Sequence, residues 1–187
     1  MNRKLLLIAL FAAFAPLSCI AEPSTPAQGA ALTNAVDQLC RWSGMLRRHD
    51  LRNPQGQKDS DVAYIAIADF LVEGQLRKYT LRFDSKFRVR YFMPEHFYLG
   101  DTSLGVDTVK QPRLRQRIIR SAATFKRQIG WKSALGPYVQ RVGSDFIVTF
   151  ETVTSEQQKR ANYEYLDPYV SFLVTPKGTV FGGFWGA

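Results

Sequence analysis

The sequence is poor in the residues on which metal binding and covalent catalysis depend, since its 187 residues include two histidines and two cysteines. The histidines are His49 and His96, and one possible ligand cluster combines His96 with Glu95 and Asp101. These three residues could supply oxygen and imidazole ligands, but they lack a recognised ligand spacing. We therefore interpret them as part of a solvated loop and expect no metal site and no cofactor.

Cysteine chemistry is restricted in the same way. Cys19 lies within a predicted export signal, so Cys40 is the single thiol of the processed chain and no intrachain disulfide is expected. A catalytic Cys40 would need a base beside it. His49 follows nine residues later, which at about 100° per residue places it on the opposite side of a shared helix. We interpret Cys40 as a buried, small apolar residue.

Motifs of other common active sites are also missing. The sequence has no Gly-x-Ser-x-Gly motif, and Gly143-Ser144-Asp145 is typical of a hairpin turn. Gly182-Gly183 lies in a predicted strand with no helix after it, so it does not form a phosphate-binding loop. We predict no catalytic residue.

Long apolar runs are missing everywhere except at the N-terminus. Arg3 and Lys4 precede an unbroken apolar run from Leu5 to Ala15, and small residues then lie at both positions that a signal peptidase reads. We predict that residues 1–21 form a secretory signal peptide, that the processed chain is periplasmic, and that it has no transmembrane segment. Lipid attachment at Cys19 stays open as the alternative.

Acidic residues are outnumbered by basic ones. The sequence has 25 Lys and Arg against 16 Asp and Glu, a net charge of +9. Removal of residues 1–21 takes away Arg3 and Lys4, so 23 basic residues face 16 acidic ones and the net charge becomes +7. This charge favours an acidic protein or an anionic envelope component as partner, and it is compatible with contact at a membrane surface. Nucleic acid is rare in an exported compartment and is not expected as a partner.

The N-terminal half of the processed chain combines helical and strand patterns. Apolar residues recur every three or four positions from about Ala30 to Arg48, which predicts an amphipathic helix. Arg52 to Asp61 is rich in turn residues and is predicted to be a loop. Val62 to Val72 is apolar on both faces, so strand and helix both stay open, and the strands that follow favour a strand.

A predicted β-hairpin and a second helix follow. Arg77 to Phe83 and Phe87 to Tyr91 alternate apolar and mostly cationic residues around the turn Asp84-Ser85-Lys86, which predicts a hairpin with one oily and one cationic face. Pro112 begins a helix that extends to about Ile129. The remaining predicted strands are 138–142, 146–153, 169–175 and 179–184, and the aromatic end of the chain is predicted to complete the core.

Helix followed by strands, twice, predicts an α+β fold. We expect an antiparallel curved sheet with the helices packed on one face, and two helix-plus-meander halves are an open reading of the same order. Glu22 to Ala187 is expected to form a single domain, with residues 22–29 as a flexible lead-in.

Two cationic faces are the candidate binding surface, one on the hairpin and one on the second helix opposite its apolar stripe. If the two faces lie together, they form an anion-binding patch, with Tyr91, Phe92 or Trp131 near enough to stack. The alternative is a solvated helix face and an edge strand protected by charge. The predicted partner-binding residues are Lys78, Arg82, Arg88, Arg90, Arg113, Arg117, Arg120 and Arg127.

The C-terminal strands carry a family resemblance. Asp145-Phe-Ile-Val-Thr-Phe150 and the segment from Tyr169 to Val180 resemble the closing hairpin of cystatin-like and nuclear-transport-factor-like domains, which recur in secreted bacterial binding and immunity proteins. The resemblance covers at most Pro112 to Ala187. It implies a small α+β domain, and it does not decide function because such folds include enzymes and non-enzymes.

These observations predict a non-enzymatic periplasmic binding protein, as an inhibitor, an immunity protein or an accessory of envelope assembly, that engages an acidic partner through its basic faces. The alternative is an envelope hydrolase with a site in the concave sheet near His96, assisted by Asp101 or Glu151.

Overall fold

The computed structural model describes residues 22–57, 62–95, 97, 109–131, 135–151 and 169–185. The predicted signal peptide, residues 1–21, lies outside the described residues. Two helices are described, α1 (Pro26–Ser43) and α2 (Pro112–Gln128). The strands are β1 (Glu22–Pro23), β2 (Leu46–Arg47), β3 (Arg52–Gly56), β4 (Tyr64–Val72), β5 (Gln75–Phe83), β6 (Val89–Pro94), β7 (Leu135–Val142), β8 (Asp145–Glu151), β9 (Tyr169–Val174) and β10 (Val180–Trp185).

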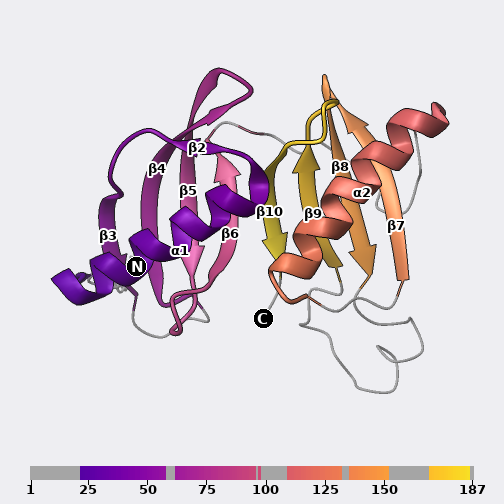
Figure 1. Cartoon of the computed structure of the whole chain (residues 1–187). Coiled ribbons are helices and arrows are strands. Elements are labelled where there is room, and N and C mark those ends of the chain that lie inside the picture. The colour runs from indigo at the N-terminus through magenta and orange to yellow at the C-terminus, as the bar shows by residue number, and fades with distance from the viewer. Residues whose placement is uncertain are drawn as a thin grey trace, which may run out of the picture.

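The strands form one antiparallel sheet in the order β1-β3-β4-β5-β6-β10-β9-β8-β7, with β2 paired to β4. Figure 1 shows both helices on the same face of this sheet, α1 over the N-terminal strands and α2 over the C-terminal strands. The predicted α+β class, with an antiparallel curved sheet and helices on one face, is confirmed. Each helix is followed by its own meander, so the helix-plus-meander order occurs twice.

Helix α1 begins earlier and ends earlier than its predicted bounds. Thr25 and Gln28 form a capping box, in which each side chain accepts a hydrogen bond from the other residue's backbone N–H, and Pro26 occupies the first helical position. Gly44, with φ of +80°, ends the helix in the left-handed conformation. The segment 22–29, predicted to be a flexible lead-in, contains β1, the cap and the first turn of α1.

Strand β3 replaces the first part of the predicted loop Arg52 to Asp61. Its turn residues fit an irregular strand, because the register against β4 shifts between Arg52 and Gln55 and Asn53 takes a φ of +48° in the irregular part. Pro54 donates no backbone hydrogen bond, but its carbonyl accepts from the backbone N–H and the hydroxyl of Ser24. The turn propensity of these residues predicted the irregular backbone correctly, but it did not predict that β3 pairs with β1 and β4.

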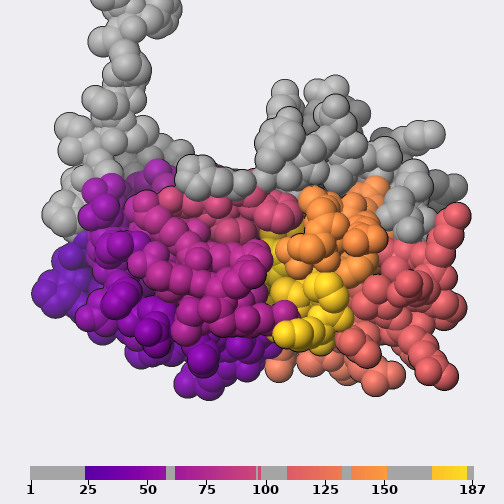
Figure 2. All heavy atoms as spheres, turned by 90° about the horizontal axis from the view of Figure 1, so that it is seen from above, coloured from indigo at the N-terminus to yellow at the C-terminus, as the bar shows by residue number. Residues whose placement is uncertain are grey.

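The core lies mainly between the helices and the sheet. Aromatic rings from several strands meet α2 there: Phe125 lies 5.7 Å from Phe92 on β6 and 5.2 Å from Phe172 on β9, measured between ring centroids. Phe181 on β10 is fully buried, which confirms that the aromatic end of the chain completes the core. Figure 2 shows the yellow residues of the chain's end lying between the N-terminal and C-terminal halves.

Neither described helix is long and apolar enough to cross a membrane.

Candidate functional site

The β5–β6 turn is organised by one carboxylate. Asp84 accepts hydrogen bonds from the backbone N–H of Lys86 (2.9 Å) and of Arg88 (3.0 Å). It also accepts from the Nε atoms of Arg88 (2.8 Å) and Arg90 (2.9 Å). Burial by itself would raise the pKa of Asp84, but these hydrogen bonds outweigh it and hold the pKa below its usual range. Two of the predicted binding arginines therefore share one internal counter-charge.

The other two hairpin cations lie on the sheet face that points away from the helices. Leu81 pairs with Phe92, whose ring contacts α2, so the residues that alternate with Leu81 face the opposite side. Lys78 forms an ion pair with Glu95 at 3.0 Å on that side. The Arg82 guanidinium lies 4.9 Å from the centroid of the Tyr91 ring.

The arginines of α2 occupy the exposed face of the helix, opposite the buried residues Ile118, Ala122 and Phe125. Arg117 donates to the carbonyl of Pro176 at 3.4 Å, and Arg127 donates to the hydroxyl of Thr124 at 3.3 Å. Within the described part of the chain, none of the four forms an ion pair with a carboxylate. The four residues, which we call the α2 arginine face, are Arg113, Arg117, Arg120 and Arg127.

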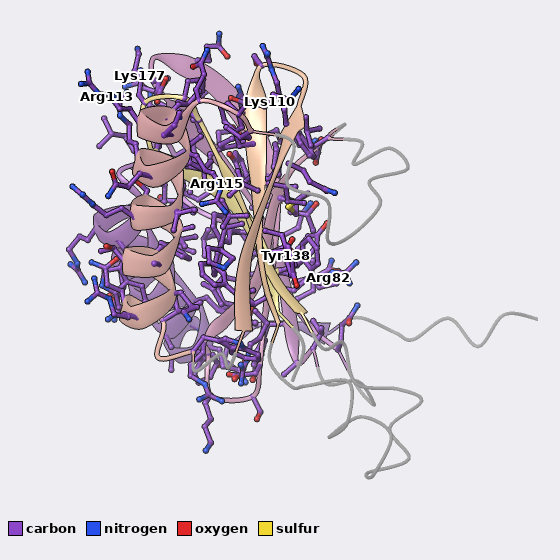
Figure 3. The ribbon with its side chains drawn as sticks, turned by 90° about the vertical axis from the view of Figure 1, so that its right-hand side faces the viewer. Arg82, Lys110, Arg113, Arg115, Tyr138 and Lys177 are labelled. Carbon is purple, nitrogen blue, oxygen red and sulfur yellow. The ribbon has the colours of Figure 1, made fainter. Side chains whose placement is uncertain are left out.

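The structure separates the two predicted basic faces. Figure 3 shows Arg113 on the outer side of α2 and Arg82 on the far side of the sheet, with the helix and the sheet between them. The condition under which both faces would form one patch is therefore not met, because the helices pack on the oily face of the hairpin and leave its cationic face on the other side. The two aromatic residues of the hairpin proposed for stacking are not available to both faces. The Tyr91 ring contacts Arg82, and Phe92 is fully buried.

A groove that the sequence did not predict lies between α1, the β5–β6 turn and the residue that follows α2. Its volume is about 580 Å³. Its apolar lining includes Trp42 and Leu39 from α1, Phe87 and Val89 from the hairpin, and Ile129 after α2. Cationic residues at its edge are Arg41, Lys86 and Arg88.

One sequence signal for this groove existed. Ala31, Ala35, Gln38 and Trp42 recur along α1 beside the buried stripe, and the two alanines leave space where larger residues would fill it. The pattern alone could not reveal which elements close the other side. That information comes from tertiary packing.

The residues considered for covalent chemistry are not arranged for it. Burial raises the pKa of the Cys40 thiol to about 11, so the thiol stays protonated near neutral pH and is a poor nucleophile. Helix α1 ends at Ser43, so His49 lies beyond the helix, in an exposed bend. The turn Gly143-Ser144 joins β7 to β8, as predicted.

Most residues of the predicted hydrolase site are not among the described residues. His96 and Asp101 lie outside the described residues, as does the side chain of Glu151. Glu95 is described, and its carboxylate pairs with Lys78. Among the described side chains, no three of His, Cys, Asp or Glu come together as a metal cluster. The hydrolase alternative therefore stays a prediction.

Comparison with known proteins gives one structural likeness. The sequence matches no protein-family model and no curated protein. The chain is similar in structure to the Bacillus megaterium YpeB C-terminal domain, with a TM-score of 0.49 and 10% sequence identity. The likeness covers 87% of this chain and 63% of that chain. The cystatin-like and nuclear-transport-factor-like resemblance stays a prediction.

Proposed function

We propose that this protein is a non-enzymatic periplasmic binding protein that docks on an acidic partner through the α2 arginine face. The observation that carries the proposal is the lack of compensating carboxylates on this face, among the described residues, in contrast to the hairpin. Arg88 and Arg90 already share Asp84, and Lys78 already pairs with Glu95. Among the described residues Arg82 also has no carboxylate partner, but it lies on the Tyr91 ring on the opposite side of the sheet. The α2 arginines are the four predicted cations that share one face without compensating carboxylates.

The same arginines work against the stability of the helix. Arg113 and Arg117 are four residues apart and Arg120 follows three later, so like charges are neighbours along one face. Like-charge pairs at this spacing cost about 0.2–0.5 kcal/mol each. Arg113 also lies in the first turn, which contains no acidic residue, where the helix dipole disfavours a cation. A docked anionic surface would relieve both penalties.

The partner that fits this face is a protein with an exposed acidic patch. Planar guanidinium groups bind carboxylates in a bidentate manner, and a row of them steers an acidic surface during encounter. As an inhibitor, an immunity protein or an envelope-assembly accessory, the protein would act by occluding the partner's surface. An anionic envelope polymer is the alternative ligand of the same chemistry.

The test is capture from envelope extract by the tagged protein, at low and high salt, with mass spectrometry of what is bound. The variant Arg113→Glu/Arg117→Glu/Arg120→Glu should capture no partner, because it reverses the charge of the face. The matched control Lys78→Glu/Arg82→Glu reverses two charges on the opposite side of the molecule and should capture the partner like the wild type. Equal capture by the α2 variant and the wild type would contradict the proposal.

A further inference from the structure

The groove between α1 and the β5–β6 turn has a charge pattern of its own. Arg41, Lys86 and Arg88 line its edge, and no acidic residue lines it. Asp84 lies behind the turn and carries one negative charge that Arg88 and Arg90 share. Arg41 and Lys86 form no ion pair within the described part of the chain. The groove edge is therefore cationic even after the nearest carboxylate is counted.

The interior of the groove is apolar and held in shape. The Phe87 ring stacks on Tyr64 with a centroid distance of 5.0 Å and an interplanar angle of 28°. Phe87 has a φ of +57°, and the hydrogen bonds to Asp84 fix the turn that places it. Because the side chains of the site are already ordered, binding a ligand costs less conformational entropy and the affinity is higher.

Size and surroundings favour a small ligand over a protein partner. A volume of about 580 Å³ lies within the range of small-molecule pockets. The large exposed apolar residues of the described chain, Leu46 and Leu76, do not line the groove. Exposed polar residues such as Asn34 and Gln38 surround the apolar interior instead. This arrangement does not supply the broad apolar contact that a docked helix needs.

We propose that this groove binds a single-chain amphiphile with an anionic headgroup, its chain against Trp42, Phe87 and Ile129 and its headgroup at Lys86 and Arg41. A carboxylate and a phosphate monoester headgroup both fit these cations, so a fatty acid and an alkyl phosphate share the required chemistry. The site does not involve the α2 arginine face, so this inference and the proposed function succeed or fail separately.

The test is titration of the processed chain with dodecanoate and dodecyl phosphate below their micellar concentrations and with dodecanol below its solubility limit, followed by calorimetry and Trp fluorescence. Both anions should bind at least about tenfold more tightly than the neutral alcohol. Whichever anion binds more tightly identifies the carboxylate or the phosphate source. Binding of dodecanol as tight as that of both anions, or no binding of any of them, would overturn the proposal.

Variants separate the two parts of the site. Ala35→Phe fills the groove and should weaken dodecanoate by at least about tenfold. Arg41→Glu/Lys86→Glu should weaken binding of the two anions and leave binding of dodecanol unchanged. Because both residues are exposed, this variant should fold and tests the site even if Ala35→Phe does not fold. Arg120→Glu, on the α2 arginine face, is the control and should bind like the wild type. Unchanged affinity in both groove variants would refute the site.

Another occupant is a second copy of the chain. Light scattering across a concentration range tests it. A dimer that Ala35→Phe converts to a monomer, with no amphiphile binding in the wild type, would overturn the proposal in favour of self-association.

Discussion

Asp84 shows how one side chain sets the shape and charge of a turn. Its side chain is 10% exposed and its carboxylate accepts four hydrogen bonds, two from the backbone and two from arginines. Charge-assisted hydrogen bonds of this kind are stronger than neutral ones. Asp84 thereby fixes the β5–β6 turn and, through it, one wall of the groove.

We predict that Asp84→Asn destabilises the protein by about 1–3 kcal/mol at neutral pH, because an amide cannot accept all four hydrogen bonds. The folded-state pKa of Asp84 lies below its usual value. Its contribution is therefore present above the unfolded pKa of about 3.9 and is lost as the pH falls through the folded pKa. Denaturant unfolding should show wild type and variant converging in acid. The control Asp50→Asn changes an exposed carboxylate and should have a small effect at all pH values.

At the scale of the elements, β10 joins the two halves of the sheet. It pairs with β6 of the N-terminal half and with β9 of the C-terminal half. The hydroxyl of Tyr79 on β5 donates to the carbonyl of Phe181 at 2.6 Å, and burial raises the pKa of Tyr79, so the donor stays protonated. Glu73, in the β4–β5 turn, accepts hydrogen bonds from Thr175 and Thr179 beside β10. These contacts link the two halves along β10 and at the turn that precedes it.

Gly182 tests the packing of β10. A Cβ at this position would lie 2.7 Å from Cδ1 and 3.1 Å from Cβ of Leu173, so the neighbour must shift. Gly182→Ala should destabilise the protein by about 1–3 kcal/mol, since overpacking forces strain into the strand pair. Leu173→Ala in the same chain should offset part of this loss in a double-mutant cycle.

The control for this prediction is Gly29→Ala. Nothing lies within 4 Å of its Cβ position in α1, so the substitution should stabilise by about 0.5–1 kcal/mol through helix propensity. Thermal unfolding followed by circular dichroism measures all four variants. Equal stability of Gly182→Ala and the wild type would show that β10 tolerates the extra atom.

At the scale of the whole molecule, basic residues are distributed over opposite sides, and their partners decide what each side can do. Of the predicted hairpin cations, Lys78, Arg88 and Arg90 pair with carboxylates and Arg82 lies on the Tyr91 ring, whereas the α2 arginine face is open to an external partner (Figure 3). Arg117 contacts the β9–β10 turn, whose Lys177 pairs with Glu73 at 3.6 Å.

The sequence predicts the parts of this fold whose pattern is local. The alternation of Arg77 to Phe83 and the stripe opposite the α2 arginines identify the hairpin and the helix correctly. The capping box at Thr25 was a readable signal that the prediction missed. Strand β3 was not readable, because its pairing with β1 and β4 depends on distant residues.

The candidate sites divide in the same way. The alternation of apolar and polar residues predicts that Lys78 and Arg82 share one face of the hairpin. Because helices are expected on the oily face, it also predicts that this cationic face lies away from α2. The internal pairing of Arg88 and Arg90 with Asp84 needed the geometry of the turn. The groove needed the relative placement of α1, the hairpin and Ile129, which no local pattern contains.

The most direct test of the central claim is the dissociation constant of the captured partner, measured against salt concentration for the wild type and for Arg113→Glu/Arg117→Glu/Arg120→Glu. The account predicts that wild-type affinity falls steeply as salt rises, because exposed charges are screened within about 10 Å at 0.1 M ionic strength. The variant should bind weakly and with little dependence on salt. A variant that binds like the wild type at every salt concentration would show that the α2 arginine face is not the docking surface.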